Sequence, residues 1–304
     1  MTRRGALGRT TAIAAAAVGG LLGCTSLSAP LPPGNPPPRN PPLRNPGVPE
    51  PMPVPYGAHP DQHAVLHLPV GGDELPVVVV VHGGFWQSSY GAELGTPIAA
   101  DVANAGLAAW NLEYRRVGGG GGWPTTFTDV AAGVDALAGA AQQAAGGRLD
   151  LGRVVLVGHS AGGQLAVWAA GRHRLPAGAP GADPVVRPVG AVSQAGVLDL
   201  VDGARQRLGG SAVPGLLGGG PDAVPDRYQL ASPVALVPLG VPVVCVHGTE
   251  DGIVPLRQSE RFVAAAGAQT ELVVLPGVGH FELIDPSQSA WTACRDAVIR
   301  LLGP

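Results

Sequence analysis

The chain contains no lysine, because all 19 of its basic residues are arginine. A Walker-type phosphate loop needs a lysine after its glycines, and a Schiff-base enzyme needs a lysine amine, so both chemistries are excluded. Charged residues make up only 13% of the 304 residues, and the net charge is −3. This near-neutral balance gives no basic surface for nucleic acid, and we expect no nucleic-acid partner.

Cysteine is also scarce, with three residues in the whole chain. Cys245 lies in an apolar run, and Cys294 shares a helical stripe with other apolar residues, so we expect two buried thiols. A disulfide between them after export is the alternative. Three histidines, at 59, 63 and 67, have the spacing of metal ligands on a helix, but Pro60 between them disfavours a helix. We therefore predict neither a metal site nor a cofactor.

The first 24 residues have the composition of an export signal. Arg3, Arg4 and Arg9 precede an apolar run at 11–23 that is too short to span a bilayer stably. The run ends in Leu-Leu-Gly-Cys24, which resembles a bacterial lipobox. The pair Arg3-Arg4 before the run resembles a twin-arginine signal. We expect a signal peptide at 1–24, lipidation of Cys24, and a lipoprotein anchored on the extracytoplasmic face of the membrane. An ordinary signal peptide with a chance cysteine is the alternative.

A proline-rich segment follows the signal. Residues 30–55 are half proline, a composition that favours extended polyproline II and has no run able to bury itself. We expect a disordered linker at 25–55 that acts as a stalk between the membrane and a folded domain.

From residue 56 to the end, short apolar runs alternate with helix-length segments. Five consecutive valines at 77–81 are typical of a strand buried on both faces of a parallel sheet. Other strands are expected at 65–68, 107–112, 154–157, 189–193, 241–246 and 272–275, and helices near 95–105, 128–145, 161–172, 256–266 and 287–302. This alternation predicts one domain at 56–304 with a doubly wound, mostly parallel α/β sheet. The Gly- and Pro-rich stretch 197–237 breaks the rhythm and is expected to form a short cap.

One serine stands at a strand end in the sequence Gly158-His159-Ser160-Ala161-Gly162. In an open parallel sheet, sites form beyond the carboxyl ends of the strands. A nucleophile turned sharply between strand and helix needs glycines two residues on either side, which this G-x-S-x-G pattern supplies. The pattern alone also fits a plain turn serine, but an apolar strand and a helix-like segment flank it here.

A serine nucleophile needs a base, and the base needs an orienting acid. Asp251 follows the strand at 241–246, and His280 follows the strand at 272–275, so both should emerge on the same edge as Ser160. Glu250 and Asp285 compete for the role of the acid. The chain order Ser, Asp, His resembles that of the α/β-hydrolases.

The five-valine strand leads directly into His82-Gly83-Gly84-Phe85-Trp86. Acyl transfer builds negative charge on a carbonyl oxygen, which needs preorganised donors. One N–H of this loop and that of Ala161 would form an oxyanion hole; a plain glycine-rich turn is the alternative.

Taken together, HGGFW, NLEYR, GHSAGG, HGTEDGIVP and GHF resemble the α/β-hydrolase superfamily. The resemblance is to its esterase and lipase-like branch, which includes kynurenine formamidase-like enzymes and bacterial feruloyl or acetyl-xylan esterases. It implies an α/β-hydrolase fold over 56–304, with Ser160 as nucleophile, His280 as base and Asp251 as its partner. It also implies oxyanion donors at Gly84, Phe85 and Ala161. Compared with the family, the sheet looks trimmed at its first edge.

Three aromatic residues, Trp86, Trp123 and Phe281, flank the expected site and are candidates for a substrate pocket. A place in the core is the alternative, above all for Trp123. Arg115 is expected to support the loop after its strand by a local bond. The sequence thus predicts an exported serine hydrolase that cleaves a small-molecule carboxylic ester. An arylformamidase or peptidase-like amide hydrolase is the alternative enzyme, and a non-catalytic binding lipoprotein on the same fold is the alternative of another class.

Overall fold

The computed structural model describes residues 47–303. The signal peptide expected at 1–24, with Cys24, and most of the linker expected at 25–55 lie outside these described residues.

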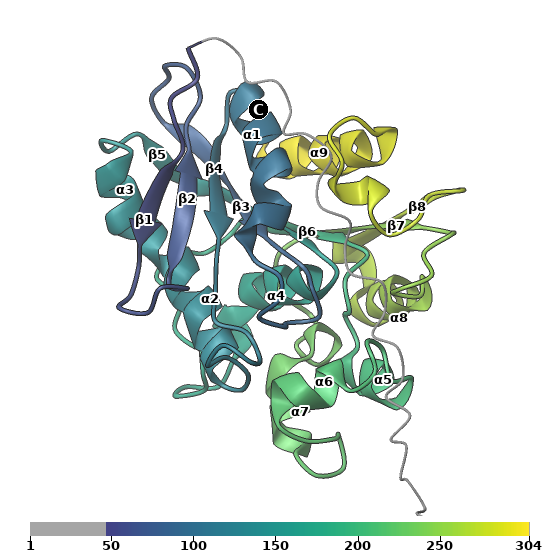
Figure 1. Cartoon of the computed structure of the whole chain (residues 1–304). Helices are drawn as coiled ribbons and strands as arrows, with labels where there is room; N and C mark the ends of the chain where they lie inside the picture. The colour runs from purple at the N-terminus through teal and green to yellow at the C-terminus, as the bar shows by residue number, and fades with distance from the viewer. Residues whose placement is uncertain (1–46, 304) are drawn as a thin grey trace, which may run out of the picture. The chain divides into compact units, whose positions relative to one another are not determined.

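A single mixed sheet of eight strands forms the centre of the described chain (Figure 1). Its order is β1-β2-β4-β3-β5-β6-β7-β8, in which β2 runs antiparallel to both neighbours and all other pairs are parallel. The predicted mostly parallel α/β sheet is therefore confirmed. The strands are β1 (Met52–Pro55), β2 (His63–His67), β3 (Leu75–Val81), β4 (Ala108–Leu112), β5 (Leu149–His159), β6 (Gly190–Gln194), β7 (Val243–Gly248) and β8 (Thr270–Leu275).

The first edge of the sheet corrects two expectations. β1 lies inside the segment predicted to be a linker, and it pairs with β2 from Met52 opposite Leu66 to Pro55 opposite His63. An edge strand tolerates Pro53 and Pro55 because only one side of its backbone must pair. The sheet is consequently not trimmed, and the folded domain begins before residue 56.

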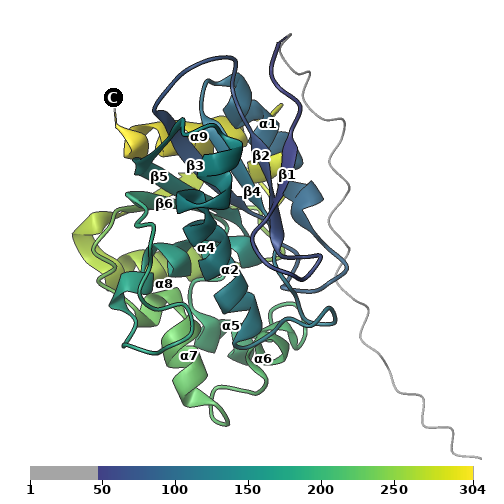
Figure 2. The ribbon, with the colours of Figure 1, turned by 90° about the vertical axis from the view of Figure 1, so that its left-hand side faces the viewer.

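Helices cover both faces of the sheet (Figure 2). Both faces need cover because successive apolar side chains of a strand point to opposite faces. In β3, Val78 and Val80 face a cluster completed by α1 (Thr96–Asn104) and α9 (Ser289–Leu302). The other valines of β3 face the larger cluster, which includes residues of α2 (Thr125–Asp135), α3 (Ala140–Ala144), α4 (Ala161–Ala170) and α8 (Arg257–Ala266). The single helix expected at 128–145 is divided, with a break at Gly139.

The predicted cap segment forms three short helices, α5 (Leu200–Arg205), α6 (Ala212–Leu217) and α7 (Pro225–Ala231), which lie together on one side of the sheet (Figure 1). Hydrogen bonds join the cap segment to the rest of the domain. Gln164 and Trp168 of α4 donate to the carbonyls of Ala231 and Leu230, and Gln258 of α8 accepts from the Asp199 amide. The cap is thus held from two helices. Within residues 47–303, no helix is long and apolar enough to cross a membrane.

Candidate active site

Ser160 is the single residue between the end of β5 and the start of α4. Its backbone has φ +55° and ψ −118°, a strained conformation for a residue with a side chain. The amide of Ser160 donates to the carbonyl of Gln194 on β6 at 2.8 Å, which fixes the turn to the neighbouring strand. The predicted nucleophile therefore stands on the strained strand-to-helix turn that the motif requires.

The glycines around Ser160 are required by close backbone contacts. A Cβ on Gly158 would collide with the carbonyl oxygen of Gly162, and a Cβ on Gly162 would collide with the carbonyl of Val81. A Cβ on Gly83 would lie 3.2 Å from the Cβ of Ser160. The turn thus closes only with glycine at these positions, and it brings the loop after β3 against the serine.

Asp251 and His280 meet at the ends of β7 and β8, as predicted. The Nδ1 of His280 donates to Asp251 Oδ2 at 2.6 Å. Asp251 Oδ1 accepts the amides of Ile253 and Val254 at 2.9 and 2.8 Å, which orients the carboxylate. Glu250, the neighbouring competitor for the acid's role, is exposed.

A second histidine supports the acid. Burial by itself raises the pKa of Asp251, but hydrogen bonds from His247 and His280 outweigh it and hold the pKa well below its usual range. The Nε2 of His247 lies 3.4 Å from Asp251 Oδ2 and 2.8 Å from the carbonyl of Val254. His247 is not among the residues predicted for the site, although it lies only four residues before Asp251 in the sequence.

His159, the residue before the nucleophile, packs against the predicted base. Its Nε2 donates to the carbonyl of His280 at 2.9 Å, and the two ring centroids are 4.4 Å apart. Burial, followed by the nearby His280, lowers the pKa of His159 well below its usual value, so His159 is neutral. Because His159 directly precedes Ser160, this contact holds Ser160 and His280 at the same edge of the sheet. Both residues are almost fully buried.

The predicted oxyanion loop has three consecutive residues with positive φ, namely Gly84 (+104°), Phe85 (+49°) and Trp86 (+55°). A Cβ on Gly84 would collide with the side chain of Tyr90, and the amide of Gln87 closes the turn on the Gly84 carbonyl. The third predicted donor, Ala161, is the first residue of α4. These amides remain the predicted oxyanion donors.

The predicted aromatic pocket is only partly correct. Trp86 has no exposed area, and its indole N–H donates to Gln164, so it belongs to the core and not to a substrate pocket. Trp123 packs against Phe127, and its amide donates to the Leu216 carbonyl of the cap. Phe281 remains beside the site, with its ring edge-on to His280 at a centroid distance of 5.2 Å.

The structure instead shows a pocket that the sequence did not reveal. It has a volume of about 290 Å³ and lies between the oxyanion loop, the loop at 117–118 and helix α6 of the cap. Serine hydroxyls and small apolar groups line it, and none of its lining side chains carries a charge: Phe85, Gln87, Ser88, Ser89, Val117, Gly118, Ser211, Ala212 and Gly215. Phe85 connects this pocket to the expected oxyanion hole.

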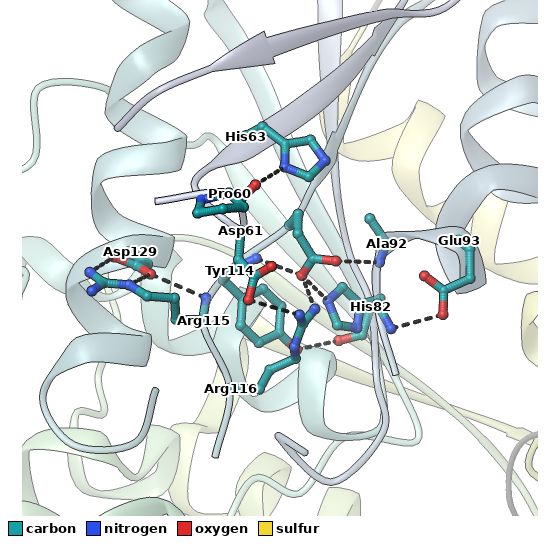
Figure 3. A network of polar contacts seen from close by, with 12 residues as sticks. Pro60, Asp61, His63, His82, Ala92, Glu93, Tyr114, Arg115, Arg116 and Asp129 are labelled. Atoms are coloured by element: carbon teal, nitrogen blue, oxygen red, sulfur yellow. Dashed lines mark hydrogen bonds and ion pairs between the residues drawn. The ribbon is translucent and has the colours of Figure 1, made fainter. Parts of the chain in front are cut away.

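Charged side chains behind the oxyanion loop form a network (Figure 3). Arg115 donates through Nε and Nη2 to both carboxylate oxygens of Asp129 at 2.7 and 2.8 Å, as expected of a local support. Glu113 accepts from His82 and Arg116. Burial alone would raise the pKa of Glu113, but the bonds from His82 and Arg116 lower it to about 2. Glu113 is therefore ionised at neutral pH.

Cys245 and Cys294 are free and buried, as predicted, and burial raises the pKa of both thiols to about 12. The alternative disulfide between them is not formed. Within residues 47–303 no cluster of three or more potential metal ligands occurs.

The sequence profile of the BD-FAE family matches residues 66–265, which include Ser160 and Asp251. The chain belongs to the BD-FAE family. This is an esterase family of the α/β-hydrolases, so the predicted class, a serine carboxylic ester hydrolase, is confirmed.

Two relatives from Mycobacterium tuberculosis (strain ATCC 25618 / H37Rv) are similar to the chain. An uncharacterized protein is 32% identical over 234 residues, covering 76% of this chain and 71% of the relative. Esterase LipC is 30% identical over 231 residues, covering 72% of this chain and 56% of LipC.

Solved structures share the fold. A truncated carbohydrate esterase from gut microbiota has a TM-score of 0.71 at 19% identity, covering 85% of this chain and 98% of that chain. Esterase 2 of Thermogutta terrifontis, phosphoramylated by tabun, has a TM-score of 0.65 at 24% identity, covering 86% of this chain and 97% of that chain. These similarities confirm the α/β-hydrolase fold.

Proposed function

We propose that the chain is an exported, lipid-anchored serine esterase with Ser160 as nucleophile, His280 as general base and Asp251 as its orienting acid. One observation carries the catalytic assignment: the strained Ser160 stands at the same sheet edge as the bonded His280–Asp251 pair. The reaction of a structural neighbour with tabun, an organophosphate, gives further support, because such reagents modify activated serines.

The proposed reaction has two stages. His280 Nε2 removes the proton of the Ser160 hydroxyl as its Oγ attacks the ester carbonyl, and Asp251 holds the His280 Nδ1–H and stabilises the imidazolium. Amides of the oxyanion loop and of Ala161 stabilise the negative oxygen. His280 then protonates the leaving alcohol, and it activates the water that releases the acid from Ser160.

The uncharged pocket beside Phe85 indicates the substrate class. A lining of serine hydroxyls and apolar groups without any charge suits an uncharged group that carries several hydroxyls. We therefore propose acylated neutral sugars or polyols as substrates. The carbohydrate esterase among the structural neighbours agrees with this chemistry.

Filling the pocket tests this specificity. The variant Ala212→Phe should lower the ratio of kcat/KM for an acetylated methyl xyloside to kcat/KM for methyl acetate by about tenfold, since only the sugar needs the pocket. The control is Ala264→Phe, the same change on the exposed face of α8, which should leave the ratio at its wild-type value. An unchanged ratio in Ala212→Phe would show that the sugar binds elsewhere.

The proposed anchor rests on the sequence of residues 1–24, outside the described part of the chain. A basic head, a short apolar run and Leu-Leu-Gly-Cys24 form the pattern of a lipoprotein signal. In phase partition with a detergent, the full-length protein made in a bacterium should enter the detergent phase, and Cys24→Ser should enter the aqueous phase. A wild-type protein found only in the aqueous phase would contradict the anchor.

A further inference from the structure

Two successive carbonyl groups of the oxyanion loop are fixed by side chains behind it. The Nδ1 of His82 lies 2.8 Å from the carbonyl oxygen of Gly83. The hydroxyl of Tyr114 donates to the carbonyl of His82 at 2.8 Å, and the Tyr114 ring stacks on the His82 ring with centroids 4.4 Å apart. The fixed carbonyl of Gly83 immediately precedes the amide of Gly84, which is expected to serve the oxyanion.

Both ring nitrogens of His82 face acceptors. A carbonyl oxygen has no proton to donate, so the contact with Gly83 requires a proton on Nδ1. Nε2 lies 3.1 Å from Oε1 of Glu113, which is ionised and also only accepts. His82 satisfies both contacts as the doubly protonated imidazolium, and its side chain is fully buried.

Glu113 is held in place by bonds from several parts of the chain. The amides of Ala92 and Tyr114 donate to it at 2.9 and 2.7 Å, and the guanidinium of Arg116 pairs with it. Arg116 in turn pairs with Asp61 at 3.1 Å. Two cations and two anions therefore balance, so the cluster acts by fixing geometry and adds little net charge behind the loop.

The peptide between Gly83 and Gly84 needs such a constraint. It has no side chain on either side, and glycine offers little steric resistance to rotation of the peptide plane. In a trans peptide the C=O and N–H point in opposite directions. Holding the Gly83 carbonyl against His82 therefore directs the Gly84 N–H to the opposite side of the loop, while Gly83 itself is packed against Ser160.

We propose that His82, held as an imidazolium by Glu113, is a positioning residue that directs the Gly84 N–H at the oxyanion formed on Ser160. This inference rests on the proposed esterase function. It assigns a task in the reaction to His82, which makes no contact with the reacting atoms.

A matched pair of variants isolates the positioning contact. In His82→Asn the amide nitrogen replaces Nδ1 and can still donate to Gly83, whereas in His82→Gln it replaces Nε2 and can donate only to Glu113. Both remove the charge and the stacked ring. Loss of one oxyanion donor costs about 10²–10³ in kcat, so partial misorientation in His82→Gln should lower kcat on the order of 30-fold, with KM within about twofold. His82→Asn should lose less than about fivefold on the same basis.

Titration of active sites with a fluorophosphonate normalises each rate to the folded, reactive fraction. The proposal expects a low rate per titrated site in His82→Gln and a rate near wild type in His82→Asn. A purely structural role would give fewer titratable sites with an unchanged rate per site, or equal losses in both variants, and would overturn it. An unreactive wild-type protein would instead overturn the proposed esterase function, so the two failures are distinguishable.

Discussion

Replacement of Ser160 by alanine is expected to abolish ester hydrolysis. The variant lacks the nucleophile, and only the oxyanion donors and substrate binding remain, so kcat for a short-chain p-nitrophenyl ester should fall by about 10⁶. The strained turn does not depend on the hydroxyl, because its glycines and the bond from the Ser160 amide to Gln194 remain. The expected variant is folded and inactive.

The matched control is Ser287→Ala, which removes an exposed serine hydroxyl bonded to Asp285. Its kcat should equal that of the wild type. Thermal unfolding of all three proteins should show similar midpoints. Hydrolysis by Ser160→Ala at more than a few per cent of the wild-type rate would exclude Ser160 as the nucleophile.

Replacement of Asp251 by asparagine is expected to lower kcat by about 10⁴ with the fold retained. The asparagine oxygen can still accept the amides of Ile253 and Val254, but it brings no charge to stabilise the His280 imidazolium. An amide also permits the wrong tautomer of His280. Because the pKa of Asp251 lies well below its usual range, the wild-type carboxylate is ionised when the assay is run at neutral pH.

Asp285 provides the control, since it follows His280 by five residues and competed with Asp251 in the sequence. In the structure Asp285 accepts from Ser287, and Asp251 is the carboxylate bonded to His280. Asp285→Asn should keep the wild-type rate. If Asp285→Asn lost activity and Asp251→Asn kept it, the assignment of the acid would be wrong.

Much of the site could be predicted because its residues follow strand ends. The apolar runs located β5, β7 and β8, and the direction of a parallel sheet then places Ser160, Asp251 and His280 at one edge. The glycines of the elbow were predicted on steric grounds, and their close backbone contacts confirm the reason.

The parts that escaped prediction depend on contacts between distant segments. Trp86 appeared to flank the site, but its indole bonds to Gln164, 78 residues later, and is buried. β1 was not predicted because its prolines suggested a linker, although an edge strand tolerates them. The pocket arises where cap helix α6 meets two loops, and no local pattern signals such a meeting.

The buried charge network shows the same limit. Glu113 could be predicted only as part of a motif. Its partner His82, and Asp61, which pairs with its other partner Arg116, come from distant stretches of the chain. The two acceptors that face the ring of His82 can likewise be identified only in the structure.

The most direct test of the central claim is to locate the covalent adduct of a fluorophosphonate. The wild-type protein, treated at neutral pH, digested and analysed by mass spectrometry, should carry one adduct per chain on the oxygen of Ser160. Prior incubation with an acetylated sugar substrate should slow its formation. An adduct on another residue, or no adduct on protein that is folded by thermal unfolding, would contradict the account.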